Sequence, residues 1–384
     1  MDHSRHWVGT WATSPAPTEA GVGFNNHTLR MNPRVSIGGD TLRVRVSNAY
    51  GHGKLVIGAA SVGIRDQGPA IVPGSGRQLT FSGSSAATVA AGALVLSDAV
   101  TLDVPPLTDL AVSLYLPGEI PPSFQITGRY ARQTNYISPP SNFAAAITMP
   151  VGKITDEWFF LSGIDVLASH ETGGVVALGD SLTDGNLSTH DAYCRWPDQL
   201  ARRLIAHARQ GGRPLGVMNQ GLGGNRILHD VRGDSGLRRV DRDVLVQPGV
   251  THVIVMLGTN DLRNRYGKPD EEVTADQMIA GLYQMALRAQ ARGIKVLGAT
   301  LTPFGNETFL PGAWNPVRER HRVAVNQWIR KSSVLDGVVD FDKALRDPER
   351  PTQMLPRYDC GDGLHPSDLG YCAMGDAIDL ALFD

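Results

Sequence analysis

The chain of 384 residues contains only three cysteines, Cys194, Cys360 and Cys372. So few cysteines exclude a small scaffold held by many disulfides, although a single bridge between Cys360 and Cys372 is compatible with their number. No Cys-x-x-Cys or His-x-x-x-His pair offers the ligand spacing of a metal site. From the sequence we therefore expect no metal and no other cofactor.

A surplus of charge of one sign is also lacking, because 36 Lys and Arg face 38 Asp and Glu, for a net charge of −2. This balance gives no electrostatic reason to expect nucleic acid or an anionic membrane as a partner. No apolar run approaches the ~18 residues of a membrane span, so we expect no insertion into a membrane. The oligomeric state stays open at this stage.

The first residues, MDHSRHWVGTWATSP, lack the apolar core of about 7–15 residues that a secretory signal contains. We therefore expect either a protein that is cytoplasmic as encoded or a secreted protein whose signal has been removed. Apolar residues make up 42% of the chain, enough for a sizeable core. At roughly 100–200 residues per domain, this length corresponds to one large domain or two ordinary ones.

Residues 1–168 have the rhythm of β-strands. In TLRVRVS (41–47) and DLAVSLYL (109–116), apolar residues recur at every second position. Turn signals such as NAYGHG and VPGSG separate these segments. We predict an antiparallel β-sandwich or jelly-roll domain for residues 1–168.

Residues 169–384 instead alternate short apolar strands with segments of helix length. The predicted strands begin at Gly174, Leu215, His252, Ile294 and Gly337. A capping box at Thr274 and Gln277 and a serine at position 367 mark the starts of two later helices. Apolar strands that alternate with helices predict a parallel sheet covered on both faces, a three-layer α/β/α domain.

In such a sheet, ligands bind beyond the carboxyl ends of the strands. Polar and glycine-rich segments follow three of the predicted strands: GDS (179–181), NQGLGGNR (219–226) and GTNDL (258–262). A fourth segment, DGLHPSDLG (362–370), precedes the last predicted helix. We expect these four segments to meet along one edge of the sheet.

The residue types in these segments fit nucleophilic catalysis. A serine such as Ser181 needs a base to remove its proton, and His365 is a candidate for that base. Asp362, three residues earlier, could bind the second ring nitrogen and fix the tautomer. Each residue also has a purely structural interpretation: Ser181 as a helix N-cap, His365 as a turn residue and Asp362 as an Asx-turn.

A serine nucleophile also requires hydrogen-bond donors for the oxyanion that forms in its reaction. The Ser181 N–H at a helix start, an N–H of the glycine-rich turn at 221–224 and the side-chain amide of Asn260 are candidates. Asn260 could equally be a turn former, and the glycines could be ordinary loop residues.

The segments GDSLTDG, NQGLGG, GTND and DGLH resemble the first, second, third and fifth blocks of the GDSL or SGNH hydrolase superfamily. The resemblance covers about residues 174–384 and maps the family's invariant residues onto Ser181, Gly224, Asn260 and His365, with Asp362 completing the triad. It implies a flavodoxin-like three-layer fold, Ser181, Gly224 and Asn260 as the oxyanion hole, and serine esterase or lipase activity without a metal.

The N-terminal half, with WVGTWATSP and VRVSNAYG, is more loosely similar to two-domain bacterial members related to xylan-esterase-like proteins. This likeness suggests a carbohydrate ester as substrate. Polar and aromatic residues in SNAYGHG and RYARQTNY lead us to expect that the β-domain shapes the substrate pocket, with ordinary solvated turns as the alternative.

The sequence thus favours a serine carboxylesterase, a carboxylic ester hydrolase that removes short acyl groups, acetyl above all, from a small-molecule or carbohydrate ester. A lipolytic or aryl esterase is the alternative within this class, and an acyltransferase would use the same triad. A polysaccharide-binding module with a non-catalytic α/β scaffold is the alternative from another class.

Overall fold

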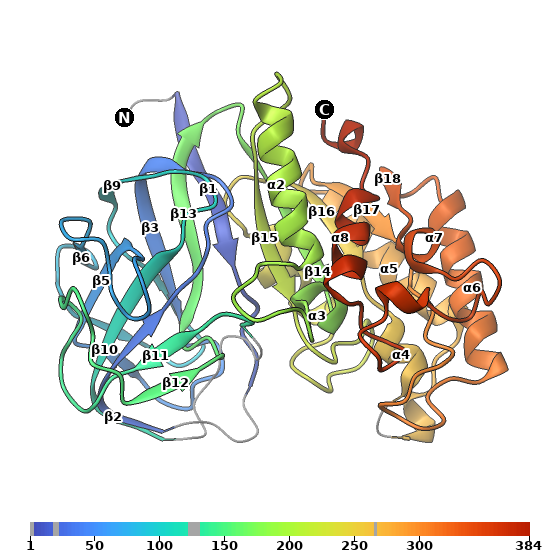
Figure 1. Ribbon diagram of the computed structural model, residues 1–384, viewed down its shortest axis with the longest axis horizontal. Helices are drawn as coiled ribbons and strands as arrows, with labels where there is room; N and C mark the ends of the chain where they lie inside the picture. The colour runs from blue at the N-terminus through green and yellow to red at the C-terminus, as the bar shows by residue number, and fades with distance from the viewer. Residues whose placement is uncertain (1–3, 18–22, 122–130, 265–266) are drawn as a thin grey trace. The chain divides into compact units, whose positions relative to one another are not determined.

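The computed structural model describes residues 4–17, 23–121, 131–264 and 267–384. It divides into two compact units, Met1–Thr172 and Gly173–Asp384 (Figure 1). Met1 to His3, and Arg129 and Tyr130 of the RYARQTNY segment, lie outside the described residues. Among the residues that are described, no helix has the length and apolar character needed to cross a membrane.

The first unit is built from antiparallel strands, and its described part contains no helix. The strands are β1 (Arg5–Ala12), β2 (Phe24–Met31), β3 (Gly39–Ser47), β4 (Leu55–Ile57), β5 (Ala59–Ile64), β6 (Arg77–Leu79), β7 (Ala87–Val89), β8 (Leu94–Leu96), β9 (Val100–Val104), β10 (Leu110–Ile120), β11 (Asn135–Ile137), β12 (Lys153–Thr155) and β13 (Leu161–Ser169). One five-stranded sheet has the order β1-β13-β3-β8, with β9 also paired to β3, and a six-stranded sheet has the order β12-β11-β2-β10-β5-β6. Strands β4 and β7 form a separate pair.

The two large sheets share one hydrophobic core. The apolar residues at every second position from Leu110 to Leu116 of β10 are fully buried, as the alternating sequence predicts, and so are the apolar residues of β3. These residues belong to a single buried cluster with side chains from both sheets. The unit is therefore a β-sandwich, as predicted from its sequence.

The arginines that alternate with the apolar residues of β3 do not lie free in solvent. Arg43 and Arg45 both contact Asp165 on the neighbouring strand β13, at 3.0 Å and 3.2 Å, and the Asp165 side chain is completely buried. A buried carboxylate needs such partners, because an unpaired charge away from water is costly. The alternation predicted which face is apolar, but it could not identify this ion cluster.

The second unit is a parallel sheet with helices. Its strands are β14 (Gly173–Gly179), β15 (Leu215–Gly221), β16 (Val250–Met256), β17 (Lys295–Ala299) and β18 (Gly337–Val339). Its α-helices are α1 (Ser181–Asp184), α2 (Trp196–Ala208), α3 (Gly236–Val240), α4 (Thr259–Arg263), α5 (Ala275–Gln290), α6 (Pro316–Lys331), α7 (Phe341–Leu345) and α8 (Asp368–Asp376). Short 3₁₀ or π turns lie at Pro269–Glu271, Asp241–Leu245, Pro356–Tyr358 and Leu380–Phe383.

The sheet order is β15-β14-β16-β17-β18, with all pairs parallel. Right-handed crossovers then place α2 and α8 on one face and α3, α5 and α6 on the other. The helix contacts agree, because α2 packs on α8, and α5 packs on α3 and α6 (Figure 1). The predicted three-layer α/β/α class is confirmed, and the order reverses between β14 and β16, where a ligand site is expected.

The helix starts predicted from capping residues also agree with the structure. Thr274 and Gln277 form a reciprocal capping box before α5, and the Ser367 side chain accepts the Gly370 N–H at the start of α8. Helix α8 ends at Asp376, however, earlier than the apolar pattern alone indicates. The Asp379 side chain caps a new 3₁₀ turn by accepting the Ala381 N–H, which separates the last residues from α8.

Candidate active site

Ser181 lies at the carboxyl end of β14, as the first residue of α1. The capping function belongs to its neighbour, because the Asp180 side chain accepts the Leu182 N–H at 2.9 Å. The Ser181 hydroxyl is therefore not needed to start the helix. It lies instead 3.0 Å from Nε2 of His365.

The imidazole of His365 joins Ser181 to Asp362. Its Nδ1 lies 2.6 Å from Oδ2 of Asp362, and its side chain is almost fully buried. With Nδ1–H donated to the carboxylate, Nε2 carries the lone pair that can accept the serine proton. The structure thus brings together the three residues that the sequence singled out, although they are separated by up to 184 positions.

The turn that carries Asp362 is held by its own backbone. Oδ1 of Asp362 accepts the N–H groups of Leu364 and His365, at 2.9 and 2.7 Å. Partial burial opposes ionisation of this carboxyl, but its hydrogen bond with His365, the charge of that ring and the two N–H groups outweigh burial and hold its pKa well below the usual range. The sequence pattern D-x-x-H therefore makes a rigid, ionised partner for the histidine.

Asn186 is a residue of this site that the sequence analysis missed. Its Nδ2 lies 3.4 Å from Nε2 of His365, beside the Ser181 hydroxyl, and its carbonyl accepts a hydrogen bond from the buried Tyr371 hydroxyl. The signal in the sequence is only an asparagine five residues after the serine. That spacing has no regular meaning, because the intervening helix α1 ends at Gly185 in a left-handed turn.

The glycine-rich turn after β15 lies against the start of α1. Gly224 has φ +79°, a conformation that side chains rarely adopt. The buried carboxylate of Asp261 accepts the N–H groups of Ile227 and Leu228 just beyond the turn, at 2.7 and 3.2 Å. Asp261, a residue of helix α4, thus holds this turn.

Arg239 of helix α3 ties the same region together. Its guanidinium is fully buried and donates to the carbonyls of Gly179 and Gln220 at 2.7 and 2.8 Å, and to Oδ1 of Asn225 at 2.9 Å. It also pairs with Asp243 at 2.9 Å, which compensates its charge. One arginine therefore fixes the end of β14 relative to the turn after β15.

Asn260 lies on α4, next to the serine segment. Its Nδ2 donates to Oδ2 of Asp180 at 3.0 Å and to the carbonyl of Asn225 at 3.2 Å. Its Oδ1 accepts from Nη1 of Arg263 at 2.8 Å. The Asn260 amide thus borders the residues expected to form the oxyanion hole. Both hydrogens on its Nδ2 are donated to acceptors within the protein.

The Asp180 side chain is buried and accepts hydrogen bonds from the Leu182 N–H and the Asn260 amide. Burial raises its pKa to about 6, against the Leu182 N–H and the positive charges of His365, Arg263 and Arg239, which favour the ionised form. The structure therefore keeps a carboxylate in an unfavourable place beside Ser181. Its two oxygens serve as acceptors for the helix start and for the Asn260 amide.

We expect Asp180→Asn to raise the free energy of unfolding by about 2 kcal/mol more at pH 8 than at pH 4. Because the pKa of about 6 lies above the ordinary 3.8, the folded protein holds this proton more tightly than the unfolded chain. Stability is therefore lost as the pH rises from about 4 to 6, and asparagine removes that loss. Urea unfolding at the two pH values measures it, and an equal effect of the substitution at both would contradict it.

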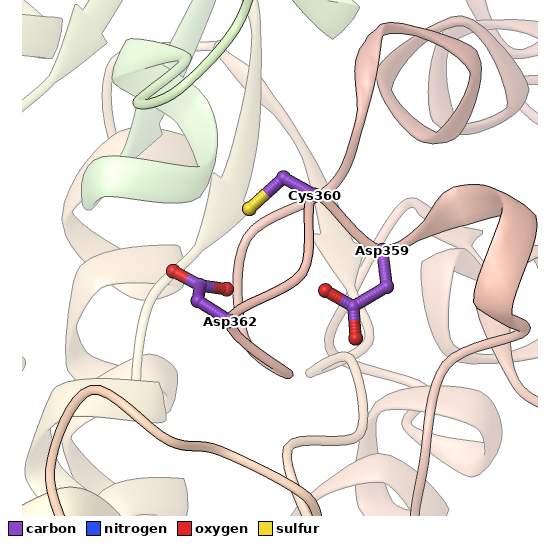
Figure 2. A group of neighbouring side chains, drawn as sticks. All are labelled: Asp359, Cys360 and Asp362. Carbon is purple, nitrogen blue, oxygen red and sulfur yellow. The ribbon is translucent and has the colours of Figure 1, made fainter.

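Asp359, Cys360 and Asp362 lie together on the turn before α8 (Figure 2), and the atoms by which they could bind a metal ion are within 4.8 Å of one another. Each carboxylate has another use, since Oδ1 of Asp359 accepts the N–H groups of Gly361 and Gly363 and Asp362 binds the histidine. Burial raises the pKa of the Cys360 thiol to about 11. All three cysteines of the chain are free thiols, so Cys360 and Cys372 do not form a bridge.

Comparison with protein families gives a match to the GDSL-like Lipase/Acylhydrolase family over residues 177–373. The matched region lies within the second unit and includes the ends of β14, β15 and β16 and the turn before α8. This fold and family pattern define a hydrolase that acts on esters. The chain belongs to the GDSL-like lipase/acylhydrolase family.

The solved structures that match this chain cover about half of it. A putative acylhydrolase from Bacteroides fragilis is 21% identical, covers 54% of this chain and 86% of its own, and has a TM-score of 0.41. A carbohydrate acetylesterase from Sinorhizobium meliloti is 18% identical, with 53% and 95% covered and a TM-score of 0.42. A catalytic mutant of an acetylxylan esterase from Geobacillus stearothermophilus is 20% identical, with 53% and 91% covered and a TM-score of 0.41. The comparison with curated proteins finds no match.

Proposed function

We propose that this protein is a serine carboxylesterase that hydrolyses short-chain acyl esters, acetyl esters above all, including esters of carbohydrates. The observation that carries the proposal is the continuous hydrogen-bonded chain from Ser181 through His365 to Asp362. A nucleophile, its base and the group that orients the base are then all within hydrogen-bond distance. The preference for a carbohydrate ester rests on the resemblance of the N-terminal half to xylan-esterase-like proteins.

In the first half of the reaction, Oγ of Ser181 attacks the acyl carbonyl carbon while Nε2 of His365 takes the hydroxyl proton. The tetrahedral intermediate collapses as its bond to the alcohol oxygen breaks, and His365 returns the proton to that oxygen. Water then attacks the acyl-enzyme with His365 again as base, releasing the acid and restoring the serine. Asp362 stays ionised and stabilises the imidazolium formed in each half.

The oxyanion is assigned to the N–H groups of Ser181 and Gly224 and to the side-chain amide of Asn260. The Ser181 N–H is suited to this because it stands at the first turn of a helix, where N–H groups lack partners within the helix. For Asn260 to take part without rotating, its hydrogen near the Asn225 carbonyl must be shared with the substrate oxyanion. That contact is the longer of its two, at 3.2 Å against 3.0 Å to Asp180, so it is the easier one to exchange.

We expect Asn260→Ala to lower kcat by about 10²–10³, the usual cost of one oxyanion donor. KM should change much less, because this hydrogen bond strengthens in the transition state. Steady-state kinetics with p-nitrophenyl acetate measures both constants. A raised KM with an unchanged kcat would place Asn260 in ground-state binding instead.

We expect activity to survive dialysis against EDTA, because every step above is carried by side chains and backbone of this chain. Assays before and after dialysis, with and without added divalent ions, measure this. Loss of activity that a divalent ion restores would contradict the expectation and would direct attention to the turn shown in Figure 2.

The proposed substrate class is tested by a chain-length series of p-nitrophenyl esters run beside acetylated xylan. We expect the highest kcat/KM for the p-nitrophenyl acetate member of the series, and release of acetate from the acetylated xylan. Preference for long acyl chains would favour a lipolytic esterase, and products that appear only with an acceptor alcohol would favour an acyltransferase. Binding of polysaccharide without turnover of any ester would favour the binding module.

A further inference from the structure

A buried ion pair lies directly behind the Asn260 amide. Arg263, one turn further along α4, donates from Nε to Oε2 of Glu307 at 2.8 Å, and its Nη2 contacts the other carboxylate oxygen. The two side chains are only 4% and 1% exposed. The remaining Nη1 donates to Oδ1 of Asn260, so the guanidinium is shared between the glutamate and the asparagine.

We propose that Arg263, held by Glu307, is a positioning residue that fixes which end of the Asn260 amide faces the oxyanion. This inference rests on the proposed function, because it assigns a partner to one of the three oxyanion donors.

The argument follows from the chemistry of the amide. An asparagine side chain can rotate by half a turn and exchange Oδ1 with Nδ2 at little intrinsic cost. The Arg263 guanidinium can only donate hydrogen bonds. It therefore favours Oδ1 of Asn260 as its neighbour and disfavours Nδ2, which is also a donor. Asp180 on the other side selects Nδ2 when ionised. Since the pKa of Asp180 is raised to about 6, while an arginine stays charged, the preference that Arg263 sets does not depend on pH. The Asn225 carbonyl, which accepts from Nδ2 at 3.2 Å, favours the same orientation through a longer contact than the 2.8 Å bond from Arg263 to Oδ1.

Glu307 extends this arrangement to the turn of the histidine. The N–H of Thr308, the next residue, donates to the Asp362 carbonyl at 2.9 Å. The turn lies so close that a Cβ on Gly363 would come within 2.2 Å of the Asn306 carbonyl oxygen. The segment that binds Arg263 is therefore the same segment that supports Asp362, so the ion pair links the oxyanion side of the site to the base side.

The test is a double-mutant cycle between this pair and Asn260, with kcat and KM measured on p-nitrophenyl acetate. The pair is changed as R263M/E307Q, which removes both charges and avoids an uncompensated buried ion. We expect kcat to fall ~10–100-fold, the scale of a misplaced catalytic group, with KM within about twofold. In the Asn260→Ala background, the same change should lower kcat by less than about twofold, since its target is gone.

A matched control separates positioning from a general loss of stability. Arg322 on α6 binds Glu319 through Nε and Nη2, at 3.0 and 2.7 Å, in the same two-point geometry, and its side chain is 2% exposed. Asp342, the second ion-pair partner of Arg322, remains paired with Arg330 and Arg346 when Arg322 is changed. We expect R322M/E319Q to lower Tm without the selective loss of kcat. Arg263→Lys, which retains charge and a donor, should keep more kcat than R263M/E307Q.

The outcomes distinguish the positioning role of Arg263 from the oxyanion assignment of Asn260. Equal losses of kcat from R263M/E307Q in both backgrounds, or a similar loss in R322M/E319Q, overturn the positioning role while leaving the oxyanion assignment intact. A normal kcat in Asn260→Ala overturns that assignment and the inference with it. If R263M/E307Q does not fold, Arg263→Lys is carried through the same cycle, and additive effects there overturn the inference.

Discussion

Replacing Ser181 with alanine is expected to lower kcat by about 10⁶, the scale of losing a triad nucleophile. The change removes the hydroxyl that lies 3.0 Å from Nε2 of His365, the group that this base is proposed to activate. The backbone N–H groups of the oxyanion hole remain, which is why a residual rate above that in water is expected. Initial rates with p-nitrophenyl acetate at high enzyme concentration measure both.

The fold should be little changed, because Asp180 and not Ser181 caps helix α1. Ser188→Ala is a matched control: this serine is also buried, lies in the same segment and donates to the Gly185 carbonyl at 2.8 Å. It should keep the parent kcat. A serine-directed phosphonate should label Ser181 alone, as shown by mass spectrometry, and a single adduct at another serine would refute the assignment.

The sequence could predict this much of the site because parallel strands share a carboxyl edge. Three short polar segments after β14, β15 and β16 must lie near one another once the strands pair in parallel. The position of Ser181 follows from that geometry alone. The fourth segment, with Asp362 and His365, was identified from its residue types and its place before the last helix, and the family resemblance supported it. No periodicity determines the distance of this segment from the sheet edge.

The supporting residues could not be predicted in the same way. Arg239 and Arg263 lie on short helices, and in a sequence such arginines are indistinguishable from solvated ones. Their functions depend on partners in other segments: the carbonyls of Gly179 and Gln220 for Arg239, and Glu307 for Arg263. Contacts of this kind have no period and no fixed spacing, so only a three-dimensional structure reveals them.

In the β-sandwich unit, too, the sequence pattern predicts which residues are buried but not which residues form ion pairs. Alternation in β3 correctly predicted which residues enter the core, since burial of one face follows from the period of two. It could not predict that Arg43 and Arg45 would enclose Asp165, because that residue lies on β13, more than a hundred positions away. Register between distant strands decides such pairs.

Asp362→Asn is expected to lower kcat by about 10⁴ while leaving the position of His365 nearly unchanged. The amide can donate to Nδ1 of the ring, and the tautomer then places a proton on Nε2, where the lone pair must accept the serine proton. The loss thus arises from the wrong tautomer and from a less stabilised imidazolium. Steady-state kinetics on p-nitrophenyl acetate measures it, and a kcat within tenfold of the parent would remove Asp362 from the triad.

Asp359→Asn provides the control within the same turn. The Asp359 carboxylate accepts backbone N–H groups as Asp362 does, but it has no bond to the ring of His365. Both substitutions should lower Tm near neutral pH, because each removes a carboxylate whose hydrogen bonds hold the turn. The pKa of Asp362 is held far below its usual range, so the stability it adds is present above about pH 4 and is lost only in stronger acid. Only Asp362→Asn should also lower kcat at a temperature where both variants are folded. An equal loss of kcat in the two variants would show that the turn, and not the carboxylate at Nδ1, is what catalysis requires.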